Sequence, residues 1–184
     1  MENNCDDRLT LRPYEPSDAE TIITWITDES TLRSWSADRY DHFPITADNI
    51  NAHYDDLSAE RGDVHPLTAV IGQSIAGHMV LAPAKYEPGA IRFMYVIVDD
   101  KRRGTGIGRR MLSLAVRYAF DELNAMKITL GVFENNPAAY RCYSSVGFRD
   151  LGDNKAHYVH LMGEDRKCFE MELTKERIKH EHTG

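Results

Sequence analysis

The sequence lacks long apolar runs, contains few cysteines and has fewer basic than acidic residues. No stretch approaches the ~20 apolar residues that a membrane-spanning helix needs. The three cysteines, Cys5, Cys142 and Cys168, are odd in number and form no Cys-x-x-Cys pair, so we expect free thiols and no structural zinc. The net charge of −7 argues against general nucleic-acid binding, which requires clustered positive charge.

Length and composition predict one globular domain. The chain has 184 residues, of which 42% are hydrophobic and 28% charged. We expect a single domain over residues 1–184, with its core at about 8–173 and a charged tail at 174–184. His180 and His182 lie in that tail, where a solvated chain end is expected and not a metal site. The polar, acidic start is unlike a secretory or transit peptide, so a cytoplasmic location is expected.

Hydrophobic periodicity predicts strands and helices in alternation, which indicates an α/β (α+β) fold. Strands are expected at about 8–13, 66–71, 75–82, 90–98, 127–133, 157–162 and 168–173. Helices are expected at about 19–26, 46–57, 107–123 and 136–146, with helical turns and a loop over 28–43. Ser17 or Asp18 should cap the first helix, and Thr46 the second. The turn from Gly163 to Arg166 should join the last two strands.

A glycine-rich turn between an apolar strand and a helix carries the strongest chemical signal. Gly104, Gly106 and Gly108 stand at alternate positions, so a ligand can approach the main-chain amides closely. Those amides open a helix, where unpaired N–H groups and the helix dipole favour an anion. Basic side chains surround the turn: Arg102, Arg103, Arg109 and Arg110. The pattern predicts a pyrophosphate site; a solvated glycine-rich loop is the alternative.

Spacing decides between the known phosphate loops. A dinucleotide fingerprint would need glycine where Arg109 stands, and a P-loop would need Gly-Lys followed by Ser or Thr at Arg109 and Arg110. Both patterns fail. The pattern Arg-x-x-Gly-x-Gly, formed by Arg103, Gly106 and Gly108, resembles the acetyl-CoA pyrophosphate loop of the GNAT superfamily of N-acetyltransferases.

A second motif stands one helix and one strand downstream, at the distance found in that family. It is similar to the family pattern Asn-x-x-Ala-x-x-x-Tyr-x-x-x-Gly-Phe, with the fixed positions Asn136, Ala139, Tyr143, Gly147 and Phe148. The order of elements over roughly residues 8–173 matches as well. The resemblance implies the GNAT fold, an acyl-CoA N-acyltransferase fold with a mixed, twisted sheet of about seven strands flanked by about four helices. Its fourth and fifth strands are expected to splay apart.

The resemblance also implies acetyl-CoA as co-substrate and no metal. The pantetheine arm would pair with the fourth strand at Val96, Ile97 and Val98, although the valines also suit a strand core. Main-chain N–H groups of the loop would hold the pyrophosphate: Arg103, Gly104, Thr105, Gly106, Ile107, Gly108 and Arg109. Asn136 would lie near the pantetheine, and its alternative role is a helix cap. A main-chain N–H near Val98 would polarise the thioester carbonyl.

The acid of the reaction can be assigned by resemblance, but the base cannot. Tyr143 would donate a proton to the departing CoA sulfur, although an aromatic on an amphipathic helix also suits a core. The two family positions for a glutamate base hold Arg92 and Gly131 here. Glu134 and Tyr95 are candidate substitutes, and deprotonation through ordered water is the third route.

Of the two substrates, the amine acceptor is the one that the sequence determines least. The Leu-Arg-Pro opening and the tryptophan segment look like the branch with ribosomal-protein N-terminal, polyamine and aminoglycoside acetyltransferases. Aromatic residues either line an amine pocket through cation–π contacts or close the core: Trp25, Trp35, Tyr40 and Phe43. Asp28, Glu29 and Asp38 would add negative charge to such a pocket.

The sequence therefore predicts an N-acetyltransferase that moves the acetyl group of acetyl-CoA to a primary amine of a small molecule or peptide. The amine would attack directly in a ternary complex. The rival hypothesis is a non-catalytic acyl-CoA-binding or regulatory module. Neither a nucleic-acid nor a membrane partner is expected, and a homodimer is expected only by family resemblance.

Overall fold

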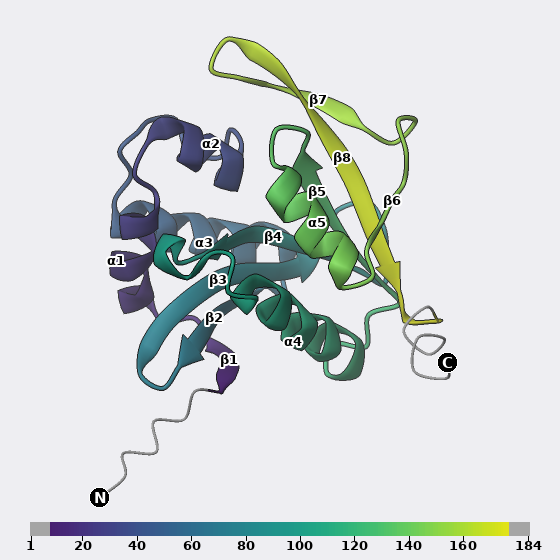
Figure 1. Cartoon of the computed structure of the whole chain (residues 1–184), viewed down its shortest axis with the longest axis horizontal. Helices are drawn as coiled ribbons and strands as arrows, with labels where there is room; N and C mark the ends of the chain where they lie inside the picture. The colour runs from purple at the N-terminus through teal and green to yellow at the C-terminus, as the bar shows by residue number, and fades with distance from the viewer. Residues whose placement is uncertain (1–7, 177–184) are drawn as a thin grey trace, which may run out of the picture.

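The computed structural model describes residues 8–176, which form a mixed eight-stranded sheet with helices on both faces (Figure 1). The strands are β1 (Leu9–Pro13), β2 (His65–Ile71), β3 (Ser74–Pro83), β4 (Ala90–Val98), β5 (Lys127–Phe133), β6 (Arg149–Asp150), β7 (His157–Leu161) and β8 (Glu164–Thr174). The α-helices are α1 (Ala19–Ile22), α2 (Glu29–Ser36), α3 (Ala47–Arg61), α4 (Ile107–Asp121) and α5 (Pro137–Ser145). Cys5, His180, His182 and most of the expected tail lie outside the described residues.

The sheet order is β1-β2-β3-β4-β5-β8-β6, with β7 paired to β8. The strands β1 to β4 form an antiparallel meander, and β1 lies at the edge and ends at Pro13, as its sequence predicts. The single parallel pair is β4 with β5, and α4 makes the crossover between them. The hairpin of β7 and β8 extends beyond the rest of the sheet (Figure 1).

Each face of the sheet has its own hydrophobic core. On one face, α4 and α5 pack through residues such as Met111, Leu112 and Tyr143. On the other, α1, α2 and α3 pack through residues such as Ile22 and Ile50. These two layers lie on opposite sides of the sheet in Figure 1. Within residues 8–176, none of the helices has the length and apolar character that crossing a bilayer requires.

The strands β4 and β5 separate after three residue pairs. Ala90, Ile91 and Arg92 pair with Lys127, Ile128 and Thr129, and no later residue of β4 pairs with β5. From Phe93 to Val98, the edge of β4 that faces β5 therefore has main-chain groups without a strand partner. The expected splay is confirmed.

A β-bulge interrupts β4 within the splayed part. In the pairing with β3, Val80 stands opposite Met94 and His78 opposite Ile97, so Met79 alone faces the two residues between them. One of these is Tyr95, whose φ is +52°. Met94 and Tyr95 consequently both face the α1–α3 layer, whereas regular alternation would send them to opposite faces.

Three local expectations need correction. The segment Glu164–Arg166 belongs to β8 and pairs with β7, so the hairpin turn is Met162-Gly163. The two-residue strand β6 was not predicted, because it has too few residues for a periodic pattern. The first helix is a short α-helix between two 3-10 turns, at Pro16–Asp18 and Ile23–Trp25.

Asp18 stands at the N-cap position of α1, as the sequence predicts, but its side chain makes no cap hydrogen bond to that helix and lies instead at the centre of a buried polar network. Its carboxylate accepts hydrogen bonds from Arg12 at 2.7 and 2.8 Å and from the Thr68 hydroxyl at 2.6 Å. The N–H of Glu15 also donates to it, at 2.9 Å. Burial opposes its ionisation, but these donors together hold the pKa of Asp18 below its usual value.

Candidate active site

The glycine turn after β4 has the geometry of an anion cradle. Gly106 immediately precedes α4 with φ +84°, and Gly104 has φ +77°. A Cβ at either position would meet no protein atom within 4 Å, so the space above the turn is open. No side chain of the described residues caps α4, and its first N–H groups are therefore available to a ligand.

The third glycine has a different role. A Cβ on Gly108 would lie 3.4 Å from Cys142 Sγ on α5 and 3.6 Å from Val98 Cγ2 on β4. Gly108 therefore lies where α4 packs against both elements, and not under open space as Gly104 and Gly106 do. Arg103 Nε donates to the Val98 carbonyl at 3.4 Å, which joins the turn to the end of the strand. Arg109 and Arg110 are exposed on the first turn of α4.

The splay opens into a cleft of about 380 Å³ that lies between β4 and the second sequence motif. Val96 lines it from β4, and Asn136 and Tyr143 line it from the start and middle of α5. Val96 and Val98 pack toward α4, whereas the Ile97 side chain is buried in the opposite core. Any pairing of Ile97 with a ligand would therefore use its main chain.

Tyr143 and Asn136 occupy the wall that α5 contributes. Tyr143 is 8% exposed, and burial raises its pKa well above the usual value, so the phenol keeps its proton at neutral pH. The Asn136 side-chain oxygen accepts from the Ala139 N–H at 3.1 Å. Asn136 thus caps α5, as the alternative interpretation has it, while it also faces the cleft.

A larger cleft of about 930 Å³ lies between α3, the β3–β4 turn and the exposed face of β5 and β8. It shares four lining residues with the smaller cleft: Arg39, Arg92, Met94 and Tyr95. The two clefts therefore meet at the bulge of β4. Acidic and basic side chains line the larger cleft in near-equal numbers, and several form ion pairs: Glu60 with Lys85, Glu87 with Lys127, Glu172 with Lys127, and Glu170 with Arg92.

The ion pair of Arg92 and Glu170 occupies the place of the missing family glutamates. The guanidinium donates to the two carboxylate oxygens at 2.5 and 2.9 Å. Gly131 stands directly opposite Glu170 in the pairing of β5 with β8. A Cβ on Gly131 would lie 3.0 Å from both Arg92 Nη2 and Cys168 Sγ, so glycine leaves room for the pair.

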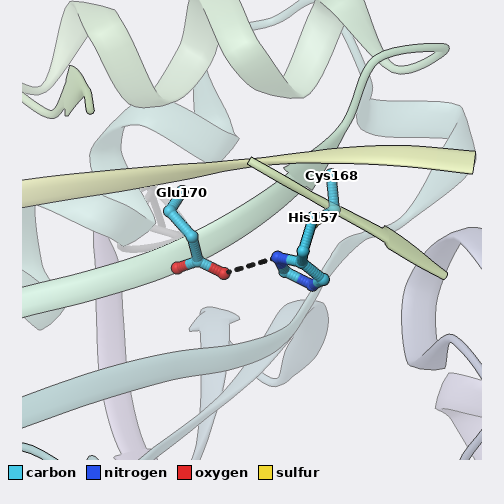
Figure 2. A group of neighbouring side chains, drawn as sticks. All are labelled: His157, Cys168 and Glu170. Carbon is cyan, nitrogen blue, oxygen red and sulfur yellow. Dashed lines mark ion pairs between the residues drawn. The ribbon is translucent and has the colours of Figure 1, made fainter. Parts of the chain in front are cut away.

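Figure 2 shows Glu170 with His157 and Cys168, whose potential metal-ligand atoms all lie within 4.8 Å of one another. His157 Nδ1 on β7 is 3.6 Å from a carboxylate oxygen of Glu170. Burial raises the pKa of the Cys168 thiol to about 11, so it is protonated at neutral pH. With this thiol protonated and the carboxylate already bound to Arg92, the group is a poor metal site.

Of the two candidate base substitutes, the structure brings only Tyr95 to the clefts. Glu134 is exposed beyond β5 and is absent from the described lining of both. The Tyr95 hydroxyl lies 2.6 Å from Nε2 of His53 on α3. Sequence reasoning missed His53 as a functional residue, although it follows Ile50 by three positions on the buried face of its helix.

The aromatic residues of the 25–43 segment divide between the two interpretations. Trp35 and Asp38 line the smaller cleft. Trp25 and Tyr40 are buried in the α1–α3 core, and Phe43 packs against it. Asp28 caps α2 by accepting from the Thr31 N–H at 2.7 Å. Glu29 pairs with Arg33 at 3.0 Å.

Comparison with known proteins agrees with this architecture. A family model described as an acetyltransferase (GNAT) domain matches residues 8–149. A spermidine N(1)-acetyltransferase of Escherichia coli K12 is 27% identical over 174 residues, which cover 95% of this chain and 90% of that protein. One from Vibrio cholerae is 26% identical over 147 residues, covering 80% and 82%. A crystal structure of the V. cholerae spermidine N-acetyltransferase with CoA and spermine has a TM-score of 0.75 at 22% identity, covering 92% and 96%.

Proposed function

Since the chain belongs to the GNAT family of acetyltransferases, we propose that it moves the acetyl group of acetyl-CoA to a primary amine of a small molecule by direct attack in a ternary complex. One observation carries the proposal: the pairing of β4 with β5 stops at Arg92 and Thr129, and the resulting cleft is lined by Val96 of β4 and by Asn136 and Tyr143 of the second motif. A second, larger cleft meets it at the bulge of β4.

Acetyl-CoA would bind mainly through main-chain groups. The N–H groups at the start of α4 would hold the pyrophosphate, over the run from Arg103 to Arg109 that contains Gly104, Thr105, Gly106, Ile107 and Gly108. The pantetheine amides would pair with the free edge of β4 at Val96, Ile97 and Val98, and Asn136 would contact the arm from α5. A main-chain N–H near Val98 would then donate to the thioester carbonyl as negative charge develops there.

Tyr143 would act as the acid for the leaving group. Attack of the amine on the thioester carbon forms the C–N bond, and the C–S bond breaks as the tetrahedral intermediate collapses. The sulfur takes the phenolic proton, and Tyr143 regains a proton from the nitrogen of the new amide. Its raised pKa supports this role because the phenol is fully protonated before transfer.

The acceptor would enter through the larger cleft. Spermidine acetyltransferases among the relatives make polyamines the first acceptors to test. The carboxylates of the cleft are largely engaged with lysine or arginine, so a polyamine would have to compete with these ion pairs. We therefore propose a small-molecule primary amine as the acceptor class, with polyamines as one member.

The proposal is tested by thiol release from acetyl-CoA with a panel of amines: spermidine, spermine, putrescine, kanamycin and a short peptide with a free N-terminus. We expect acceptor-dependent release of CoA with at least one small-molecule amine, together with its N-acetyl product by mass spectrometry. Binding of acetyl-CoA by calorimetry without release for any amine would favour the rival role of a non-catalytic acyl-CoA-binding module.

A further inference from the structure

We propose that Tyr95 and His53 form a relay that removes the proton from the acceptor ammonium before attack. This inference rests on the proposed function, because it concerns the same transfer. It also supplies a proton acceptor that the two family positions, Arg92 and Gly131, cannot provide. The requirement is general, since a primary amine with a pKa near ~10.4 is mostly protonated at pH 7 and cannot attack a thioester.

The position of Tyr95 is the first argument. Its side chain lies at the junction of the two clefts, where an amine from the larger cleft would meet a thioester in the smaller one. The β-bulge of β4 places this side chain on the α1–α3 side together with that of the preceding residue, Met94. A non-glycine residue with φ +52° is uncommon, and such backbone conformations concentrate at functional sites.

The partner of Tyr95 is the second argument. The hydroxyl lies 2.6 Å from His53 Nε2, and the two rings meet edge to face with centroids 5.3 Å apart. When Tyr95 donates to Nε2, its oxygen keeps lone pairs that can accept a hydrogen bond from an ammonium group. His53 is only partly buried and lines the larger cleft, so a proton it receives can pass on to solvent.

The charges around His53 favour the neutral imidazole that a base requires. Burial lowers its pKa, as does the guanidinium of Arg39 from the loop after α2. Asp56 and Glu60, on its own helix, act in the opposite direction but do not reverse the shift. The rings of Tyr40 and Tyr54, with centroids at 5.3 and 6.1 Å, complete its surroundings.

Arg39 also favours deprotonation of the other two groups. It lines both clefts beside Tyr95 and opposes the effect of burial on the pKa of that phenol, which is nevertheless raised to about 12. Tyr95 therefore starts as a neutral phenol and serves as a relay, not as a resting phenolate. An ammonium that enters beside the same guanidinium has its own pKa lowered by like-charge repulsion.

The proton balance of the step is simple. The ammonium gives one proton to the Tyr95 oxygen while the Tyr95 hydroxyl proton moves to His53 Nε2. The products are a neutral amine, a neutral phenol and an imidazolium, and the imidazolium releases its proton through the larger cleft. Tyr143 is not involved until the thioester bond breaks on the other side of β4.

The chain offers a matched control. A second histidine–tyrosine pair, His65 on β2 and Tyr118 on α4, is joined by a contact of 3.4 Å with ring centroids 5.8 Å apart. Neither residue belongs to the described lining of the two clefts. Replacing His65 removes a comparable imidazole at a distance from the proposed chemistry.

The experiment measures kcat/KM from pH 6.5 to 10, with the panel amine that releases most CoA in the wild type. We expect His53→Gln and Tyr95→Phe each to lower kcat/KM at least about 10-fold at pH 7. The loss should shrink toward pH 10, where the free amine needs no base. The double variant should be no worse than the poorer single variant, because the two residues act in one relay. His65→Gln should keep the wild-type profile.

Three results would overturn the relay: a wild-type profile in His53→Gln, a loss that is equal at every pH, or strictly additive losses in the double variant. The Kd for acetyl-CoA, measured by calorimetry, shows whether each variant still folds and binds its co-substrate. If His53→Gln does not, Tyr95→Phe carries the same test alone. A wild-type enzyme that is inactive with every amine would instead reject the proposed function.

Discussion

The strand β4 presents two kinds of group: its edge beside β5 and the glycine turn that follows offer main-chain groups, whereas its α1–α3 face offers side chains that need partners from remote elements. Tyr95 reaches His53 on α3, and Arg92 reaches Glu170 on β8. The first arrangement suits the pantetheine amides and the pyrophosphate of the proposed co-substrate, acetyl-CoA. The second would let the proposed acceptor site change through single substitutions on α3 or β8 without altering the cleft proposed for acetyl-CoA.

The strongest test of this contrast is a change that should damage only the α1–α3 face. Asp18→Ala removes the carboxylate that Arg12 and Thr68 share, and leaves buried donors unpaired. We expect the free energy of unfolding in urea to fall by about 3 kcal/mol. The Kd for acetyl-CoA of the folded protein should not change.

Asp153→Ala is the control for Asp18, because it removes an exposed carboxylate paired with Lys167 and should cost less than about 1 kcal/mol. Equal losses in the two variants would mean that the buried network contributes no more than a surface ion pair.

A second test acts on the α4 face and should leave folding intact. Tyr143→Phe removes the proposed leaving-group acid, so kcat should fall by about 100-fold while the Kd for acetyl-CoA stays within about twofold. Tyr140→Phe is the matched control on the same helix, since its hydroxyl bonds Asp150 at 3.1 Å instead. Full activity in Tyr143→Phe would remove this residue from the mechanism.

A third test uses the pH dependence of stability, to which a buried histidine of the α1–α3 layer should contribute. Burial lowers the pKa of His78, in the α1–α3 layer, to about 3, whereas an unfolded histidine titrates near ~6.5. As pH falls below 6.5 the unfolded chain takes up this proton and the folded chain does not. We therefore expect the free energy of unfolding to fall by about 2 kcal/mol between pH 6.5 and 5 through this residue.

His78→Gln should remove most of that pH dependence while it keeps an acceptor for the Tyr54 hydroxyl, which lies 2.7 Å from His78 Nε2. The measurement is urea denaturation at pH 5, 6 and 7, above the range in which Asp18 contributes. An unchanged slope in the variant would contradict a neutral buried imidazole.

The smallest expected effect concerns the glycine turn. Gly106→Val places a side chain over the proposed pyrophosphate site and at φ +84°, so the Kd for acetyl-CoA should rise about 10-fold by calorimetry. Gly62→Val is the control, because Gly62 has φ +83° and equally open space after α3. If both variants lose the same free energy of unfolding but only Gly106→Val binds acetyl-CoA more weakly, the weaker binding comes from the side chain over the proposed site and not from backbone strain. Equal Kd values for acetyl-CoA in the two variants would reject the glycine turn as the pyrophosphate site.

Features that short contiguous patterns determine could be predicted from the sequence, whereas contacts between distant segments could not. The bounds of β4 and β5 agree with the predicted strands, as does the Thr46 cap of α3, because short contiguous patterns determine them. Tyr95 and His53 are 42 positions apart, and only the register of β3 with β4 and the packing of α3 bring them together. Hydrophobic periodicity alone gives neither the strand register nor the helix packing.

The same limit explains why the ion pair of Arg92 with Glu170 was not predicted. Glu170 can reach Arg92 only because Gly131 stands opposite it, and that pairing depends on the register of two strands far apart in the chain. A two-residue strand such as β6 has no periodic pattern at all. The glycine turn and the Asn136–Phe148 motif, by contrast, are each continuous in sequence and could be recognised without a structure.

The bulge at Tyr95 sets the phase of side-chain alternation along β4. Before it, Phe93 faces α4; after it, Val96 and Val98 face α4 again, although an unbroken strand would have sent them to the opposite core. Deleting one residue at the bulge would restore strict side-chain alternation along β4 and would leave Val96 and Val98 facing α4. The chain would then lose one residue from the proposed acceptor side and keep the whole edge of β4 that we propose for pantetheine, so the acceptor site could change by length as well as by substitution.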